Sequence, residues 1–122
     1  MRAISLAIVT TVVATSVLVA CGGSEPSGHV RNGPATGDAV RIVAGDSFFE
    51  PDSVTVPAQQ QVTLEITNEG DIPHDFSIEG LDVSTGAIQP GEIKTITLEP
   101  KEGTFEFVCL FHGGMSGTLE SS

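Results

Sequence analysis

The stretch TITLEPKEGTFEFVC, from Thr95 to Cys109, decides the fold class. Ile96 and Leu98 alternate with Thr and Glu residues in the first half, and Phe105, Phe107 and Cys109 alternate with Thr104, Glu106 and Val108 in the second. Apolar residues with a period of two are typical of a half-buried β-strand. A turn cluster with Pro and Gly separates the two alternating runs at residues 100–103. The stretch therefore predicts two strands joined by a turn.

Similar signals recur through residues 39–122. Alternation predicts a strand over 62–67 and another over 74–79, in which His74 faces the core and Asp75 faces outward. Shorter strands are predicted at 40–43, 53–56 and 116–120. Gln89–Glu92 has the Pro and Gly of a type II turn. About seven short strands without a helical stripe predict an all-β protein, an antiparallel Greek-key β-sandwich.

The composition restricts the function. The chain has 122 residues, a formal net charge of −11, and neither Trp nor Tyr. Phosphates would be repelled, so we expect no nucleic-acid partner and no charge-driven binding to anionic lipids. A basic protein partner or a cation is compatible with this charge. Only two cysteines are present, and one is assigned below to anchoring, so a disulfide framework is excluded.

The N-terminus predicts export. Arg2 precedes an apolar run that extends to Val19, and Leu18-Val19-Ala20-Cys21 resembles the lipobox of bacterial lipoproteins. The resemblance implies a signal peptide over residues 1–20, cleavage before Cys21 and lipidation of its sulfur. The domain would then be anchored on the periplasmic or extracellular face of a bacterial membrane. The alternative is an uncleaved N-terminal helix that leaves Cys21 free.

A change in composition sets the domain boundary. Residues 22–38 are rich in Gly, Ser and Pro and lack periodic apolar residues, which predicts a flexible tether over 21–38. His29 lies in this segment and is expected to be solvated. The folded domain is predicted to span residues 39–122.

The segment Cys109–Met115 carries the chemistry. Cys109, His112 and Met115 recur at a spacing of three, and Gly113-Gly114 permits the tight loop that would bring them together. Thiolate, imidazole and thioether are ligands that favour copper over magnesium, calcium or manganese. His74 begins a predicted strand and would meet Cys109 at one end of the sandwich. Two His and one Cys with a weak axial Met is the blue-copper arrangement.

These residues resemble those of the cupredoxins, the small type 1 copper proteins. The spacing Cys-x-x-His-x-x-Met is similar to that of the amicyanin type, and Pro73-His74-Asp75-Phe76 looks like the family's first-His motif. The resemblance covers about residues 39–120. It implies one type 1 copper per chain, held by His74, Cys109, His112 and Met115, and single-electron transfer outside the cytoplasm.

Two positions depart from the family's pattern. Asp75 replaces the Asn that commonly ties the two ligand loops together, and Phe111 replaces a Pro that often precedes the second His. Unlike Pro, Phe111 has an amide hydrogen that could bond to the thiolate. Hydrogen-bond donors around a ligand tune the redox potential.

Other interpretations remain open at this point. Each proposed ligand alone could be an ordinary core residue, as buried Cys and Met often are. A copper chaperone or storage protein is the alternative function, although chaperones favour exposed, Met-rich sites. An adhesion-like sandwich without metal is a third. An enzyme is not expected, because four protein ligands leave no open position. We expect a monomer that docks redox proteins through a basic or apolar patch on the partner.

Overall fold

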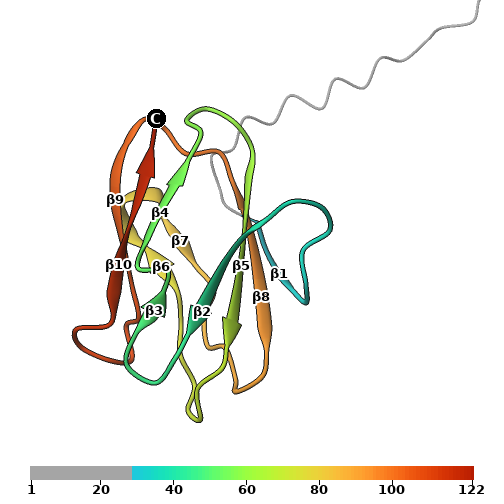
Figure 1. Cartoon of the computed structure of the whole chain (residues 1–122), viewed down its shortest axis with the longest axis vertical. Helices are drawn as coiled ribbons and strands as arrows, with labels where there is room; N and C mark the ends of the chain where they lie inside the picture. Colours follow the sequence, from blue (N-terminus) through green and yellow to red (C-terminus); the bar gives the residue numbers. More distant parts are fainter. Residues whose placement is uncertain (1–28) are drawn as a thin grey trace, which may run out of the picture.

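The computed structural model describes residues 29–122, which form two facing β-sheets of five strands each (Figure 1). The first sheet contains, in spatial order, β1 (His29–Asn32), β8 (Ile93–Leu98), β5 (Val62–Asn68), β2 (Val40–Ala44) and β3 (Phe49–Glu50). The second contains β4 (Ser53–Val56), β10 (Ser116–Ser121), β9 (Gly103–Val108), β6 (Ser77–Ile78) and β7 (Val83–Ser84). A single 3₁₀ turn, η1 (Glu79–Leu81), joins β6 to β7. The predicted all-β sandwich is confirmed.

Aromatic packing joins the two sheets. Phe49 of the first sheet contacts Phe76 and Phe107 edge-on, with ring centroids 5.5 and 5.3 Å apart. Phe76 and Phe107 are themselves 4.9 Å apart. All three rings are buried among the aliphatic side chains of both inner faces. Edge-to-face pairs at these distances add to the stabilisation by burial.

Two strand pairs run parallel, contrary to the antiparallel prediction. β2 pairs with β5 and β4 pairs with β10, both in parallel register. Between β2 and β5 the chain passes through β4, in the opposite sheet, before it returns. Parallel neighbours require such a crossover. Strand alternation carries no information about which strands become neighbours, so the sequence could not predict these pairs.

The first strand lies inside the predicted tether. Residues 29–32 pair in antiparallel register with β8, from His29 opposite Thr97 to Asn32 opposite Lys94. All four residues are exposed, so main-chain pairing forms this strand and no apolar alternation marks it. The tether prediction is wrong for these residues. The predicted signal peptide, the lipidation site Cys21 and the tether before His29 lie outside the described residues.

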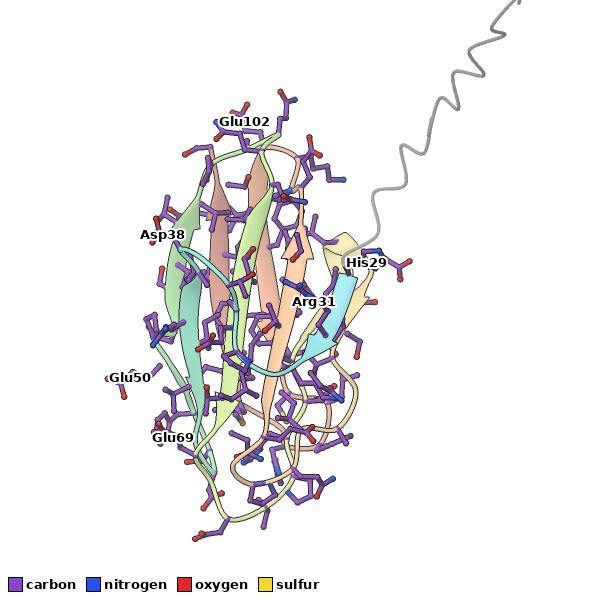
Figure 2. All side chains as sticks on the ribbon, turned by 90° about the vertical axis from the view of Figure 1, so that its right-hand side faces the viewer. His29, Arg31, Asp38, Glu50, Glu69 and Glu102 are labelled. Atoms are coloured by element: carbon purple, nitrogen blue, oxygen red, sulfur yellow. The ribbon has the colours of Figure 1, made fainter. Side chains whose placement is uncertain are left out.

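The segment after β1 covers the outer face of the first sheet. Figure 2 shows it running across that sheet between Arg31 and Asp38. The backbone amide of Ala35 donates to the Glu65 carboxylate at 2.7 Å, and Arg41 lies 3.5 Å from the same side chain. Glu65 and Thr95 are therefore buried, although their alternating positions predicted exposure.

Several connections meet at one end of the sandwich, the lower end in Figure 1. They are residues 45–48, 69–76, 85–92 and 109–115. Gly91 at the tip of one connection has φ +81°, and Glu92 donates to the Gln89 carbonyl, which fits the predicted type II turn. We call this end the site pole, because the predicted ligand residues all lie there. No helix within residues 29–122 has the length and apolarity needed to span a membrane.

The aromatic contact between the sheets gives a stability prediction. Phe107→Ala should lower the free energy of unfolding by about 3–5 kcal/mol, because it leaves a cavity between the sheets. Phe111→Ala is the matched control: its ring is 51% exposed, so we expect a change within about 0.5 kcal/mol. Urea denaturation of both variants measures this. Equal losses would contradict the assignment of Phe107 to the core.

Candidate metal centre

The loop Cys109–Met115 connects β9 to β10 and is closed at its base. The backbone amide of Cys109 donates to the Met115 carbonyl at 3.0 Å. Both side chains are buried, whereas the intervening residues are more exposed. Gly114 has φ +82°, a conformation that favours glycine. The loop thus holds a thiol and a thioether inside the protein at its two ends.

Hydrogen bonds fix His74 at the same pole. Its amide and carbonyl both pair with Ile88, at 3.1 and 2.6 Å. Asn68, at the end of β5, organises the surrounding backbone: its side-chain amide donates to the carbonyls of Ile72 and Ile88, and its oxygen accepts from Gly70. The side chains of Asn68 and His74 have no exposed surface. The sequence analysis gave Asn68 no role, and its position next to the strand predicted over 62–67 was the available signal.

The structure brings His74 and Cys109 together. The Nδ1 atom of His74 lies 3.8 Å from the Sγ atom of Cys109. Nitrogen and sulfur ligands lie about 2.0 and about 2.3 Å from a zinc-sized ion, so two such donors at about 120° are about 3.7 Å apart. The observed distance therefore fits two ligands of one ion.

The other two predicted residues are close but do not complete a formed cluster. The His112 ring lies against the His74 ring, with centroids 4.9 Å apart, and Met115 is buried at the end of the same loop. Within residues 29–122, no three His, Cys, Asp or Glu side chains together form a metal-binding group. The donor types and the contact between His74 and Cys109 fit a soft metal ion such as copper.

The Cys109 sulfur also has a backbone donor. The amide of Asp75 lies 3.5 Å from Sγ and donates to it. The sequence analysis considered Phe111 as the source of such a bond, but among the described residues the backbone donor to this sulfur is Asp75. The bond connects the sulfur to the backbone of the segment that carries His74.

The carboxylate of Asp46 faces the other ring nitrogen of His74, Nε2. Its Oδ1 atom lies 3.4 Å from Nε2 of His74 and accepts a hydrogen bond from the Asp71 amide at 2.8 Å. The bond from Asp71, supported by His74, outweighs desolvation and holds the pKa of Asp46 below its usual value. The sequence analysis missed Asp46, since nothing in the sequence connects a turn residue to a histidine 28 positions later.

Exposed apolar side chains surround this pole. Four of the five large hydrophobic residues that are exposed in the described chain lie in its connections: Phe48, Ile72, Leu110 and Phe111. Leu110 is 71% exposed. Single exposed apolar residues are common, so the notable feature is that these four are gathered at one end. We call these four residues the apolar rim.

Comparison with known proteins identifies the family. The profile of the cupredoxin-like domain matches residues 8–119. The chain belongs to the cupredoxin-like domain family. No curated protein matches it in sequence.

Solved cupredoxins share the fold. A reduced Cu(I) form of a mutant amicyanin superposes with a TM-score of 0.65 at 13% identity, covering 78% of this chain and 98% of that one. Auracyanin from Roseiflexus castenholzii gives 0.61 at 20% identity, covering 72% and 99%. A purple cupredoxin from Nitrosopumilus maritimus gives 0.53 at 21% identity, covering 68% and 99%. At these identities the likeness shows the fold alone.

In this cupredoxin-like domain, Asp75 connects the two segments that carry the predicted ligands. Its Oδ1 accepts from the Leu110 amide at 2.6 Å, and its Oδ2 accepts from the Ser77 hydroxyl at 2.9 Å. Ser77 also lies 3.0 Å from the Ser84 hydroxyl. Asp75 and Ser77 are both buried, so the predicted outward parity is wrong for them. The alternation of buried and exposed residues fails here because residues 74–78 are all buried, with protein on both faces of the segment.

The hydrogen bonds that Asp75 accepts from Leu110 and Ser77 predict a graded loss of stability when Asp75 is substituted. Asp75→Ala should lower the free energy of unfolding by about 3 kcal/mol, because the buried Ser77 hydroxyl and the partly buried Leu110 amide lose their acceptor. Asp75→Asn should lose much less, since its oxygen can still accept from Leu110 and its NH₂ can donate to Ser77. Urea denaturation of the metal-free variants measures the difference. Equal losses in both variants would show that the hydrogen bonds do not carry the effect.

Proposed function

We propose that this protein is a type 1 copper protein that carries single electrons between redox partners outside the cytoplasm. The observation that carries the proposal is the contact of the Cys109 sulfur with Nδ1 of His74 at 3.8 Å, at the pole where His112 and Met115 also lie. His74, Cys109 and His112 are the proposed strong ligands, and Met115 is the proposed weak axial ligand. One copper per chain would supply a one-electron couple between Cu(I) and Cu(II).

The surrounding residues suit electron transfer. His74 and Cys109 are buried and tied to the backbone of neighbouring segments, so the ligand side chains have little freedom to rearrange. Cys109 is only 4% exposed, so little water reaches the thiol. The His112 side chain is more exposed than these two and lies beside the apolar rim, so it is the proposed exit for the electron.

Burial of the donors argues against copper handling. A chaperone must release its ion to an acceptor, which requires exposed ligands that a partner can replace. Here the thiol, the thioether and one imidazole are almost fully buried. The four residues also come from two segments joined by the Asp75 tie, so release would require the pole to open.

The apolar rim is the proposed docking surface for the redox partner. Acidic residues border it: Asp46 and Asp71 are exposed in the same connections as Phe48 and Ile72. An apolar centre with acidic borders is complementary to an apolar partner surface with basic borders. We propose that the chain is monomeric and docks such partners transiently.

The lipobox-like stretch supports a membrane anchor. We propose that Cys21 becomes the lipidated N-terminus of the mature chain and holds the domain on the outer side of a bacterial membrane.

Copper addition tests the proposed site. Cu(II) added to the metal-free protein should give an intense blue colour from thiolate-to-copper charge transfer. Cys109→Ser should give none, because a hydroxyl is not a soft anionic ligand. Met115→Leu is the matched control within the same loop and should keep a coloured site, since the axial bond is long and weak. A colourless copper complex of the unmodified protein, measured by absorption spectroscopy, would refute a type 1 site.

Electron self-exchange tests the proposed carrier function and its docking surface. Mixed Cu(I) and Cu(II) protein should exchange electrons rapidly through contact of the apolar rims. Leu110→Asp should slow this at least about tenfold by placing a charge in that contact. Val30→Asp, on an exposed apolar residue of β1, should change little. NMR line broadening at raised ionic strength, where long-range repulsion is screened, measures the rates.

A copper-transfer assay on the same preparation distinguishes an electron carrier from a copper chaperone. An electron carrier should retain its ion in the presence of an apo acceptor protein. Slow electron exchange combined with fast copper transfer would instead establish a chaperone.

The anchor has a separate test. Cys21→Ala should abolish incorporation of labelled palmitate and leave the precursor unprocessed, because the thiol is the acylation site. Labelling of cells that express each form measures this. Label that persists in the variant would place the lipid elsewhere.

A further inference from the structure

The two ring nitrogens of His74 face two different groups. Nδ1 lies 3.8 Å from the Cys109 sulfur, and Nε2 lies 3.4 Å from the Asp46 carboxylate. The ring itself has no exposed surface. A neutral imidazole has one N–H donor and one lone pair, so the group at one nitrogen determines what the other can do.

Asp46 belongs to neither of the segments that carry the proposed ligands. It lies in the turn between β2 and β3, which is closed by a bond from the Gly45 amide to the Phe48 carbonyl. The Asp71 amide holds the same carboxylate oxygen that faces His74. The carboxylate is therefore fixed by the connection that leads into His74 as well as by its own turn.

Gly70 leaves the space that this carboxylate occupies. A Cβ atom built on Gly70 would collide with Oδ1 of Asp46 and would lie 3.0 Å from Nε2 of His74. Any other residue at position 70 would thus push the carboxylate away from the imidazole. The absence of a side chain at Gly70 and the contact between Asp46 and His74 are two parts of one arrangement.

We propose that Asp46 is a positioning residue that fixes the tautomer and the orientation of His74. The carboxylate accepts the proton on Nε2, so the lone pair of Nδ1 faces the Cys109 sulfur. Histidines that bind metals commonly donate their second nitrogen to a carboxylate or carbonyl, which fixes the ring. The ligand role of His74 rests on the proposed function, whereas the tautomer is a property of the protein itself.

The fold does not depend on the contact between Asp46 and His74. The Asp46 side chain is 49% exposed. The neighbouring chain is held by backbone bonds from the Gly45 amide to the Phe48 carbonyl and from the Glu69 amide to the Ala44 carbonyl. Removal of the carboxylate should therefore leave a folded protein in which the buried histidine loses this partner, while the exposed Asp71 amide can bond to water instead. That makes the proposal testable by substitution.

The experiment compares Asp46→Ala with Asp46→Asn. Nitrogen-15 NMR of the histidine ring in the metal-free protein reports the tautomer, and Cu(II) titration reports the affinity. Asp46→Ala should lose the uniform Nε2–H tautomer and bind Cu(II) on the order of tenfold or more weakly. Asp46→Asn should retain both properties, because its amide oxygen can accept the same proton. Asp38→Ala, a matched control at an exposed aspartate of the β1–β2 connection (Figure 2), should match the unmodified protein.

The two readouts separate this inference from the proposed function. An unchanged Nε2–H tautomer in Asp46→Ala would overturn the positioning role, whatever the copper affinity. Loss of the tautomer in Asp46→Asn as well would also overturn it, because a hydrogen bond would then not be the cause. If the unmodified protein bound no copper while Asp46→Ala changed the tautomer, the positioning role would stand and the copper proposal would fail.

Gly70→Ala provides an independent check. Its methyl group should displace the carboxylate and produce the same tautomer change as Asp46→Ala. A uniform Nε2–H tautomer in Gly70→Ala would contradict the proposed arrangement.

Discussion

The segment from His74 to Ile78 has protein on both of its faces, so every polar group that it carries needs an internal partner. The backbone of His74 pairs with Ile88, the carboxylate of Asp75 accepts from Leu110, and the amide of Asp75 reaches the Cys109 sulfur. These bonds link connections that are distant in the sequence. The geometry of the site pole follows from the need to give the polar groups of this one buried segment hydrogen-bond partners.

The sequence predicted those parts of the structure that depend on local pattern. Alternation gave the β9 strand with Phe105 and Phe107 inside, and β4 at its observed residues. Residue type and spacing also singled out the four candidate ligands, because thiol, thioether and imidazole are rare in this chain. The strands and the Cys109–Met115 loop needed only residues near one another in the sequence, and His74 was added because it begins a predicted strand.

The remaining parts depend on contacts between distant segments. β1 has no apolar side to reveal it and exists through pairing with β8. The burial of Glu65 follows from the amide of Ala35, 30 residues away. The roles of Asn68 and Asp46 arise in the same way. A polar residue that serves a distant backbone group cannot be distinguished, by sequence alone, from one that faces water.

Pairing of β1 with β8 also determines where a second domain or a solid surface can be attached to the described chain. His29 lies opposite Thr97, at the end of β8 away from the site pole, and Ser122 bonds to Ala58 and Val56 at the opposite end of the sandwich. Figure 1 shows the C-terminus at that end. Both ends of the described chain are therefore suitable attachment points. A fused domain, or an electrode linked at either one, would leave the site pole uncovered and facing outward.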